Sequence, residues 1–408
     1  MGETCRPPTR VLLCAYYPQQ LLPGLAAVIQ LRKHLGHPVT ASVTLLVWSD
    51  PGVGAPFLQL RCQAFKRLLQ AFPWVELVFP SPEEIRTALS PNFRVRSKAR
   101  WLLQRFGEDS FAAVHYAHDI GSDYLAQSAM QAFPHAVRAC FGDALGVFYT
   151  NDYYTRLTYP LAKVPECFSS PWRTLINVFW RLKRAYTLPL PHHRLDANFA
   201  IPILPCDPGG DFLSGKTLLH VERDTLNQVL EGLAEGTAMP DSETFRDMHL
   251  MLLGSYCESG FTSEDSEIDL YLEAARIHVP LGEPILLKAH PASYGNKVQK
   301  LAQALQAQYP VTLSDADPLP IEAMRHFAHC RSVISFSYSS VSLHYLYGSA
   351  VVHALTDEMI NAHFPLSIRP WMLESNTLYL NQLKYAKHLR TLQLAEAGTT
   401  VTTFNTGT

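Results

Sequence analysis

The chain has 408 residues, of which 47% are hydrophobic and 17% are charged, with 34 Lys and Arg against 36 Asp and Glu. This composition excludes a mainly disordered protein, and the length exceeds that of one ordinary hydrophobic core, so we expect two or three domains. A net charge of −2 gives the protein no global attraction to nucleic acid.

The first half of the chain alternates short apolar runs with segments of helical periodicity. Strands are predicted over residues 10–16, 43–48, 75–80, 111–116 and 136–141, and helices over 25–35, 57–71 and 123–133. Strands that alternate with helices in this way are typical of parallel α/β layers.

Residues 201–210 contain three prolines and end in Gly209-Gly210, a composition that predicts a crossing between domains. Beyond it, strands are predicted over 250–254, 284–289 and 332–336, and helices over 266–278, 298–309, 321–328 and 341–346. We therefore predict an α/β protein with two Rossmann-like domains that face a cleft. Residues 1–205 would form the first domain, 206–385 the second, and 386–408 a C-terminal tail.

The eight cysteines are scattered, with no CxxC pair and no close histidine at the spacing of a zinc site. The first ten residues lack the apolar core of a signal peptide, and no window approaches the roughly 18 apolar residues that span a bilayer. We expect a reduced, soluble, cytoplasmic protein without a structural metal.

Two nitrogenous side chains follow one another at the end of the strand predicted over 284–289. Strand alternation puts Lys288 and His290 on one face, and Pro291 fixes where the strand ends. Ligands of open parallel sheets bind at this carboxyl end. A phosphate between the two cations would relieve their repulsion, whereas a solvated lysine beside a strand-capping histidine is an equally good interpretation.

Four residues rich in hydroxyl groups, 337–340, lie between the strand at 332–336 and the helix at 341–346. Hydroxyls and free backbone N–H groups at the start of a helix form an anion site. Helix capping by Ser339 or Ser340 is the alternative, and it needs no ligand. Because two such loops follow strands of the same α/β unit, we favour a shared phosphate site.

In the first domain, the strand at 136–141 ends in Gly142-Asp143, and Gly146 follows. Flanking glycines allow a sharp turn and close approach of a ligand, and a carboxylate there can act as a general base. For an isolated Gly-Asp pair, an aspartate that bonds to its own turn is the simpler interpretation. His118 and Asp119 follow another predicted strand and are weaker candidates, for the recognition of acceptor hydroxyls.

Together these segments resemble bacterial sialyltransferases of the two-domain GT-B type, especially the capsular polysialyltransferase and lipooligosaccharide sialyltransferase group. That family has an acidic motif ending in Gly in its first domain, then a His-Pro motif and a paired-Ser motif in its second. The counterparts here are 142–146, 288–291 and Ser339-Ser340, with similar stretches at 253–256 and 319–322. The order of motifs matches from about residue 11 to 354, although the first motif has one acid where the family has two.

The resemblance implies a CMP-activated nonulosonic acid as donor and an inverting transfer to a sugar hydroxyl. Asp143 would take the proton of the acceptor, and His290 would protonate or hydrogen-bond the departing phosphate. Ser339 and Ser340 would also donate to that phosphate, and Glu322 would accept from the ribose hydroxyls unless it serves only as a carboxylate at a helix start. Lys288, Pro291, Gly254 and Ser255 complete the expected CMP site. A donor with one phosphate needs no bridging metal, and no cofactor is expected.

Two basic and aromatic stretches suit an anionic glycan acceptor or an anionic membrane, which would place the protein at the inner face of the cell membrane. The first spans 94–106 and the second 172–184. A solvated helix face with tryptophan in the core is the alternative for each.

Two other functions stay open at this point. One alternative is that the donor is another nucleotide sugar, such as CMP-Kdo or CMP-pseudaminic acid, because the motifs recognise phosphate and not the sugar. The single acid of the first motif also suits a catalytically silent nucleotide- or glycan-binding protein. A dinucleotide oxidoreductase is disfavoured, since the first strand continues into Tyr16-Tyr17-Pro18 without a GxGxxG motif.

Overall fold

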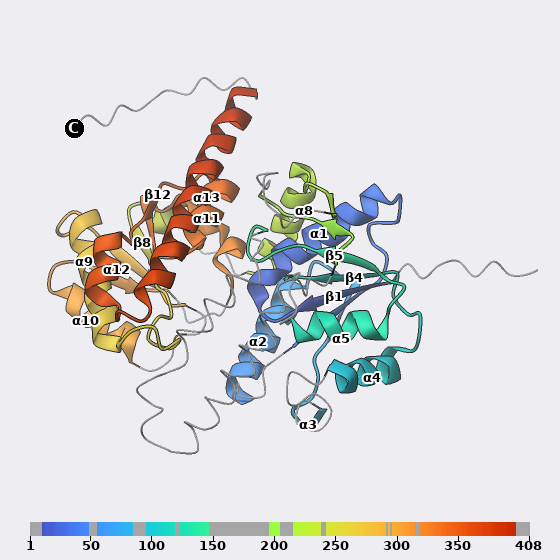
Figure 1. Cartoon of the computed structure of the whole chain (residues 1–408). Coiled ribbons are helices and arrows are strands. Elements are labelled where there is room, and N and C mark those ends of the chain that lie inside the picture. The colour runs from blue at the N-terminus through green and yellow to red at the C-terminus, as the bar shows by residue number, and fades with distance from the viewer. Residues whose placement is uncertain are drawn as a thin grey trace, which may run out of the picture. The chain divides into compact units, whose positions relative to one another are not determined.

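The computed structural model describes residues 10–48, 55–84, 95–118, 123–146, 196–204, 215–237, 242–290, 293, 296–314 and 319–396. Contacts divide the chain into two compact units, the first comprising residues 1–238 and 317–323 and the second 239–316 and 324–408. Each unit is built around its own parallel sheet (Figure 1).

The first unit contains a seven-stranded sheet. Its strands are β1 (Val11–Ala15), β2 (Val43–Val47), β3 (Val75–Val78), β4 (Ala113–Tyr116), β5 (Val137–Cys140), β6 (Phe199–Ala200) and β7 (Thr217–Leu218). Its helices are η1 (Pro18–Gln20), α1 (Leu21–His34), α2 (Ala55–Leu68), α3 (Pro82–Glu84), α4 (Val95–Phe106), α5 (Tyr124–Ala132), α8 (Arg223–Glu235) and η6 (Ile321–Ala323).

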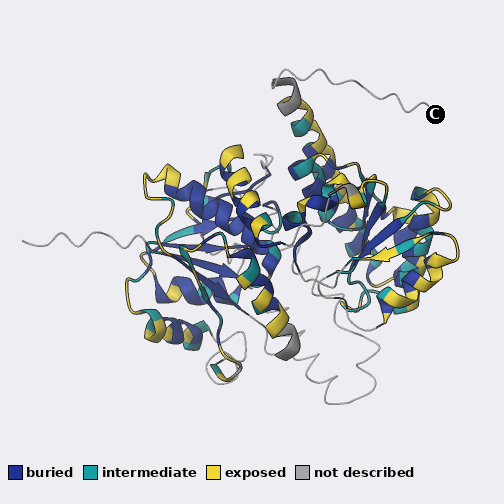
Figure 2. Ribbon diagram, turned by 180° about the vertical axis from the view of Figure 1, so that it is seen from behind, coloured by how far each residue is buried: buried dark blue, intermediate teal, exposed yellow. Residues whose placement is uncertain are grey.

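The strands of the first sheet are all parallel, in the order β3-β2-β1-β4-β5-β6-β7. This is the Rossmann order, in which the chain reverses direction across the sheet between β1 and β4. Every residue of β1 is buried, as expected for a strand covered on both faces. Helices α4 and α5 cover one face of this sheet, and α1 covers the other (Figure 1). Figure 2 shows the buried strands inside a shell of helices whose outer sides are exposed.

The second unit contains a five-stranded sheet. Its strands are β8 (His249–Leu252), β9 (Ile285–Lys288), β10 (Val311–Leu313), β11 (Ser332–Ser335) and β12 (Val351–His353). The helices are η5 (Ser242–Phe245), α9 (Glu264–His278), α10 (Lys297–Gln306), η7 (Arg325–His329), α11 (Ser339–Tyr347), α12 (Asp357–His363) and α13 (Arg369–Glu396).

The second sheet repeats the Rossmann order, β10-β9-β8-β11-β12, and all its strands are parallel. Both strand orders confirm the predicted α/β fold with two Rossmann-like domains. That the two domains face a cleft stays a prediction.

The division between the units differs from the predicted boundary at residues 205 and 206. Residues 215–237 belong to the first unit, because β7 pairs with β6 and α8 packs against α1 and α2. Lys33 of α1 donates to Thr225 of α8 at 2.7 Å and to Glu222 at 3.2 Å. The apolar face of α8 is thus part of the first core.

Two further elements differ from the sequence-based prediction. The helix predicted over 321–328 consists of the two 3₁₀ helices η6 and η7, interrupted at Met324, whose φ of −97° and ψ of 63° are not helical. Helix α13 continues through the predicted start of the tail at residue 386, because Leu383 and Ala386 are buried against the unit. Among the helices that the structure describes, none is both long and apolar enough to cross a membrane.

We predict that acid destabilises the first unit through His115, a β4 residue with 1% of its surface exposed. Burial lowers the pKa of this imidazole to about 3, whereas the unfolded chain titrates near 6.5. The folded state then binds fewer protons, so its stabilisation is complete above pH 6.5 and falls as the pH drops toward 3. At pH 4.5 the loss should be about 3 kcal/mol. Amide hydrogen exchange in β4 would measure this loss of stability. His115→Leu should reduce the pH dependence of the stability, and an equally steep loss in that variant would show that His115 is not its cause.

Candidate active site

The candidate site lies at the carboxyl edge of the second sheet, where β9, β8 and β11 are neighbours. The chain reverses direction across the sheet between β8 and β11, and ligands of open α/β sheets bind at such a switch point. The loops after β8 and β11 are joined there by the Tyr256 hydroxyl, which donates to the Phe336 carbonyl at 2.7 Å. The Ser293 hydroxyl, from the β9 loop, lies 3.4 Å from the Gly254 carbonyl.

His290 and Lys288 follow one another at the end of β9. Lys288 is the last residue of the strand and is 4% exposed, whereas His290 is half-buried. Burial, with a smaller contribution from the Lys288 ammonium, lowers the pKa of His290 to about 4. The imidazole is therefore neutral at pH 7, near the buried ammonium of Lys288.

Replacing Lys288 with methionine should raise the pKa of His290. The variant removes the ammonium charge that opposes protonation of the imidazole. The pKa should stay below 6.5, because burial is the larger cause of its depression. NMR titration of the His290 ring in both proteins measures the shift. An unchanged or lower pKa in Lys288→Met would show that the ammonium does not act on the ring.

The serines after β11 form a hydroxyl cluster. The Ser339 hydroxyl lies 2.7 Å from that of Ser335 and 3.0 Å from that of Ser337, and both Ser337 and Ser339 are half-buried. Helix α11 begins at Ser339, and its N-cap is Tyr338, which makes no side-chain capping bond. The alternative that Ser339 or Ser340 caps the helix is therefore wrong, because neither residue is at the N-cap position.

Ser340 points into the unit instead of toward the loop surface. The residue has no exposed surface, and its hydroxyl lies 2.9 Å from the Ser337 carbonyl and 3.1 Å from Nδ1 of His353. His353 Nε2 lies 2.7 Å from the Asn376 oxygen, which can only accept, so the ring carries its proton on Nε2. The predicted donation by Ser340 to a ligand would require its hydroxyl to leave these partners, whereas Ser339 is accessible. Sequence reasoning included Ser337 in the hydroxyl-rich segment 337–340 without giving it a role of its own, and it missed His353.

A buried carboxylate network holds the loop after β8, which includes Gly254 and Ser255. The Glu267 carboxylate accepts from the backbone N–H groups of Tyr256 at 3.2 Å and Cys257 at 2.7 Å. It also accepts from the Tyr271 hydroxyl, which in turn accepts from the Gly254 N–H at 2.7 Å. Three backbone N–H groups of this loop are thereby held by Glu267 and Tyr271 of α9.

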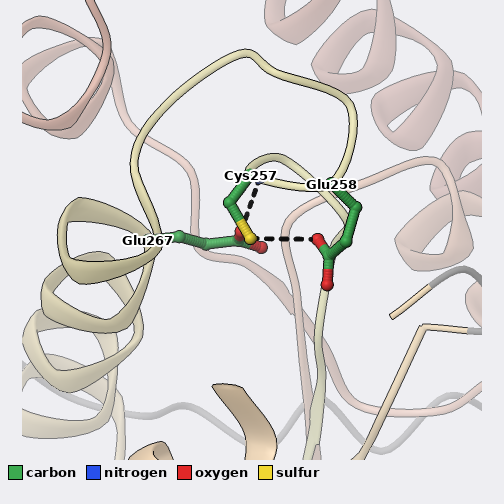
Figure 3. A group of neighbouring side chains, drawn as sticks. All are labelled: Cys257, Glu258 and Glu267. Atoms are coloured by element: carbon green, nitrogen blue, oxygen red, sulfur yellow. Dashed lines mark hydrogen bonds between the residues drawn. The ribbon is translucent and has the colours of Figure 1, made fainter. Parts of the chain in front are cut away.

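Lys297 completes the same network with a positive charge. Its ammonium has no exposed surface and donates to Glu258 at 2.8 Å, to Glu267 at 2.9 Å and to the Gly254 carbonyl at 3.2 Å. Figure 3 shows Glu258 and Glu267 directed toward Cys257, and the ligand atoms of the three lie within 4.8 Å of one another. A cation could bind such a group, but the Lys297 ammonium already pairs with both carboxylates.

In the first unit, Asp143 lies on a tight turn directly after β5. Gly142 and Gly146 have φ values of 76° and 104°. A Cβ at Gly142 would meet the Gly146 backbone at 2.7 Å, so this turn requires glycine. The Gly146 N–H donates to the Asp143 carbonyl at 2.8 Å, and the Asp143 side chain is half-buried. The predicted glycine-flanked aspartate at a strand end is therefore present.

The remaining predicted residues fall into three groups. His118 follows β4, whose end adjoins that of β5 through the hydrogen bond from Phe141 N–H to the Tyr116 carbonyl at 3.0 Å. Asp119 and Pro291 lie outside the described residues. Glu322 lies in η6, which packs against α8 of the first unit, so it does not share a unit with His290.

The first basic stretch does not form one continuous basic surface. Lys98 is 1% exposed, and its ammonium lies over the Trp48 ring, 5.6 Å from the centroid. Arg105 pairs with Glu84 at 3.1 Å and stacks on Trp101. The second basic stretch, 172–184, lies outside the described residues.

Comparison with known proteins places a family match on the second unit. Residues 239–356 match the family described as alpha-2,8-polysialyltransferase (POLYST), a segment that contains Gly254, Lys288, His290 and the serine cluster. No curated protein sequence matches the chain. The match confirms the resemblance to bacterial sialyltransferases within this segment.

Several solved structures are similar over most of the chain, with TM-scores below 0.5. Staphylococcus aureus MnaA with UDP has a TM-score of 0.47 and 8% identity, covering 96% of this chain and 98% of that one. UDP-GlcNAc 2-epimerase from Neisseria meningitidis, bound to UDP-GlcNAc, has a TM-score of 0.47 and 13% identity, covering 95% and 100%. MurG from Acinetobacter baumannii has a TM-score of 0.37 and 12% identity, covering 95% and 92%.

Proposed function

We propose that this chain, a glycosyltransferase whose residues 239–356 match the alpha-2,8-polysialyltransferase family, transfers sialic acid or a related nonulosonic acid. The donor would be CMP-activated, the acceptor a hydroxyl of a glycan or glycolipid, and the transfer inverting. The proposal is supported by the position of Lys288, His290 and Ser339 at the ends of β9 and β11, two parallel strands of the second sheet, inside the matched segment.

The side chains at this edge suit a single phosphoryl group. The buried Lys288 supplies positive charge, and the Ser337 and Ser339 hydroxyls supply neutral donors. The start of α11 adds the positive end of its helix dipole, which favours an anion within its first turn. A CMP-sugar has one phosphate, so one cation with neutral donors would match the single negative charge of that phosphate without a bridging metal.

The neutral state of His290 gives it a direct role in leaving-group departure. Its low pKa in the free protein arises from burial and from Lys288. A phosphate bound beside both groups would offset the lysine charge and raise the pKa of the imidazole. As the sugar–phosphate bond breaks, negative charge grows on CMP, and the imidazole would donate a hydrogen bond or a proton to it.

The acceptor would be activated from the first unit. An alcohol attacks poorly while it keeps its proton, so transfer requires a base near the acceptor hydroxyl. Asp143 is the proposed base, because its turn at the end of β5 presents a half-buried carboxylate. Gly142 and His118, at the same edge of the first sheet, are proposed to contact the acceptor.

The proposal is tested with a panel of CMP-sugars and acceptors. CMP release and product mass would be measured with CMP-sialic acid, CMP-Kdo and CMP-pseudaminic acid, each with galactose- and sialic-acid-terminated glycans. We expect transfer from CMP-sialic acid and its loss in Asp143→Ala, with CMP binding retained. Activity with another CMP-acid alone would correct the donor, whereas CMP binding without hydrolysis or transfer would identify a silent binding protein. Sedimentation with anionic vesicles separately tests membrane association.

A further inference from the structure

The first unit contains a cavity of about 430 Å³ that has no part in the proposed transfer. It lies between the second half of α1 and the first residues of β1, β4 and β5, which are Val11, Ala113 and Val137. Because these strands are parallel, this is the edge of the sheet opposite to the one that carries Asp143. The volume falls within the range of about 300–1,000 Å³ that is usual for small-molecule sites.

The cavity has an exposed rim and an apolar interior. The rim is formed by Leu35, His37, Asp109 and His135, which are all exposed. The interior wall consists mainly of buried apolar side chains, which are those of Val28, Leu31, Phe111, Phe133 and Ala136. A hydrocarbon chain placed here would gain about 0.8 kcal/mol for each methylene removed from water.

One wall of the cavity contains a buried histidine without hydrogen-bond partners. His115 is 1% exposed, it lines the cavity, and neither of its ring nitrogens has a partner among the described residues. Burial lowers its pKa to about 3, so the ring is neutral and carries one N–H donor. A buried polar group left unpaired costs about 1–3 kcal/mol. An occupant that pairs with this ring would recover part of that cost.

Arg32 lines the same cavity and carries a buried positive charge. It is 3% exposed, and its two terminal nitrogens donate to the carbonyls of Val39 and Ser42 at 2.8 and 3.0 Å. Among the described residues, its Nε has no hydrogen-bond partner and no carboxylate lies within ion-pair distance of the guanidinium. Burial lowers the pKa of Arg32 to about 10, so it stays charged at pH 7. A buried cation without an anion favours an anionic partner.

We propose that this cavity binds an amphipathic carboxylic acid of the fatty-acid class. The acyl chain would pack against the apolar wall, and the carboxylate would accept from Nε of Arg32 and from the ring N–H of His115. Both groups lie behind the cavity surface, so the His115 ring and the Arg32 guanidinium would both turn toward the cavity when the carboxylate binds. The inference is independent of the proposed glycosyl transfer, because none of its residues belongs to that site.

The experiment titrates octanoate into the full chain, followed by calorimetry and by NMR of the His115 ring. We expect one saturable site and a perturbed His115 resonance. Heptyltrimethylammonium, which has the same heptyl chain and the opposite charge, should bind at least about tenfold more weakly, a difference of about 1.4 kcal/mol. Acetate, without the chain, should not bind.

Variants distinguish the cavity from other surfaces. Ala136→Leu narrows the cavity and should weaken octanoate binding by at least about tenfold. Ala112→Leu, at a half-buried cavity position, gives a second test if Ala136→Leu does not fold. Leu281→Ala, an exposed leucine of the second unit, is the matched control and should change nothing. Absence of binding, unchanged binding in both filled variants, or equal binding of the cationic analogue would each overturn the proposal.

Discussion

Replacing His290 with alanine should lower kcat for transfer from CMP-sialic acid by about 10²–10⁴-fold. The imidazole follows the end of β9, two residues after the buried Lys288, at the sheet edge where β11 also ends and is followed by the serine cluster. The variant removes the donor that meets the charge developing on CMP, an interaction that strengthens only in the transition state. The change should therefore appear mainly in kcat, and KM for the donor should change less.

Two further variants make this result specific. His290→Gln keeps an N–H donor but has no transferable proton, so its kcat should lie between those of the wild type and His290→Ala. His388→Ala removes an exposed histidine from α13 and should leave kcat unchanged. Near-normal turnover of His290→Ala would move the leaving-group site away from β9.

The fold of His290→Ala should be preserved, so a lower kcat in this variant would not result from unfolding. The core of β9 consists of Ile285, Leu286 and Leu287, each at most 1% exposed, and His290 follows the strand as a half-buried residue. Removing the ring also removes a group with a lowered pKa. The folded state of the wild type resists protonation of His290, so its contribution to stability exists above pH 6.5 and decreases as pH falls toward 4. The variant lacks this acid-dependent loss.

Much of the fold could be predicted from the chain because buried parallel strands leave a strong local signal. The runs at β1, β2 and β9 are apolar on both faces, and each coincides with a predicted strand. The two-residue strands β6 and β7 were missed, since two residues give no periodicity. The boundary near residue 238 was also missed, because the attachment of α8 to the first unit depends on contacts with α1 about 190 residues earlier.

The candidate site shows the same limit at the level of side chains. Strand alternation and loop composition predicted that Lys288, His290 and the serines share one sheet edge, and β9 and β11 do end at the same edge of the second sheet; that these side chains form one phosphate site stays a prediction. The sequence did not distinguish Ser339 from Ser340, because the orientation of each hydroxyl follows from where α11 begins and from His353 on another strand. Glu267 and Lys297 look like ordinary charges in the first turns of α9 and α10. Their pairing, 30 positions apart, is a property of the packed unit.

Replacing Lys297 with methionine should destabilise the second unit by about 3–5 kcal/mol. The Glu267 carboxylate has no exposed surface, and it would lose its cation while still accepting from the loop after β8. In the wild type, burial alone would lower the pKa of Lys297, but its hydrogen bonds to Glu258 and Glu267 outweigh burial and raise it. The stabilisation by this ammonium is therefore complete below about pH 10.5 and is lost only as pH rises through the folded pKa.

The chain offers a matched control one turn further along α10. Lys300 pairs with Glu264 at 2.5 Å, but 55% of its side chain is exposed, so Lys300→Met should cost only about 0–1 kcal/mol. The double variant Lys297→Met/Glu267→Gln removes the unpaired charge, keeps an acceptor for the loop N–H groups, and should recover part of the stability. The stability difference between the wild type and Lys297→Met should also be smaller at low pH than at neutral pH, because the buried carboxyl groups of the variant then take up protons and lose their unpaired charge. Amide hydrogen exchange in β8 measures the stability of the second unit in the wild type, the two single variants and the double variant. Equal losses of stability in Lys297→Met and Lys300→Met would show that the buried network does not hold the loop.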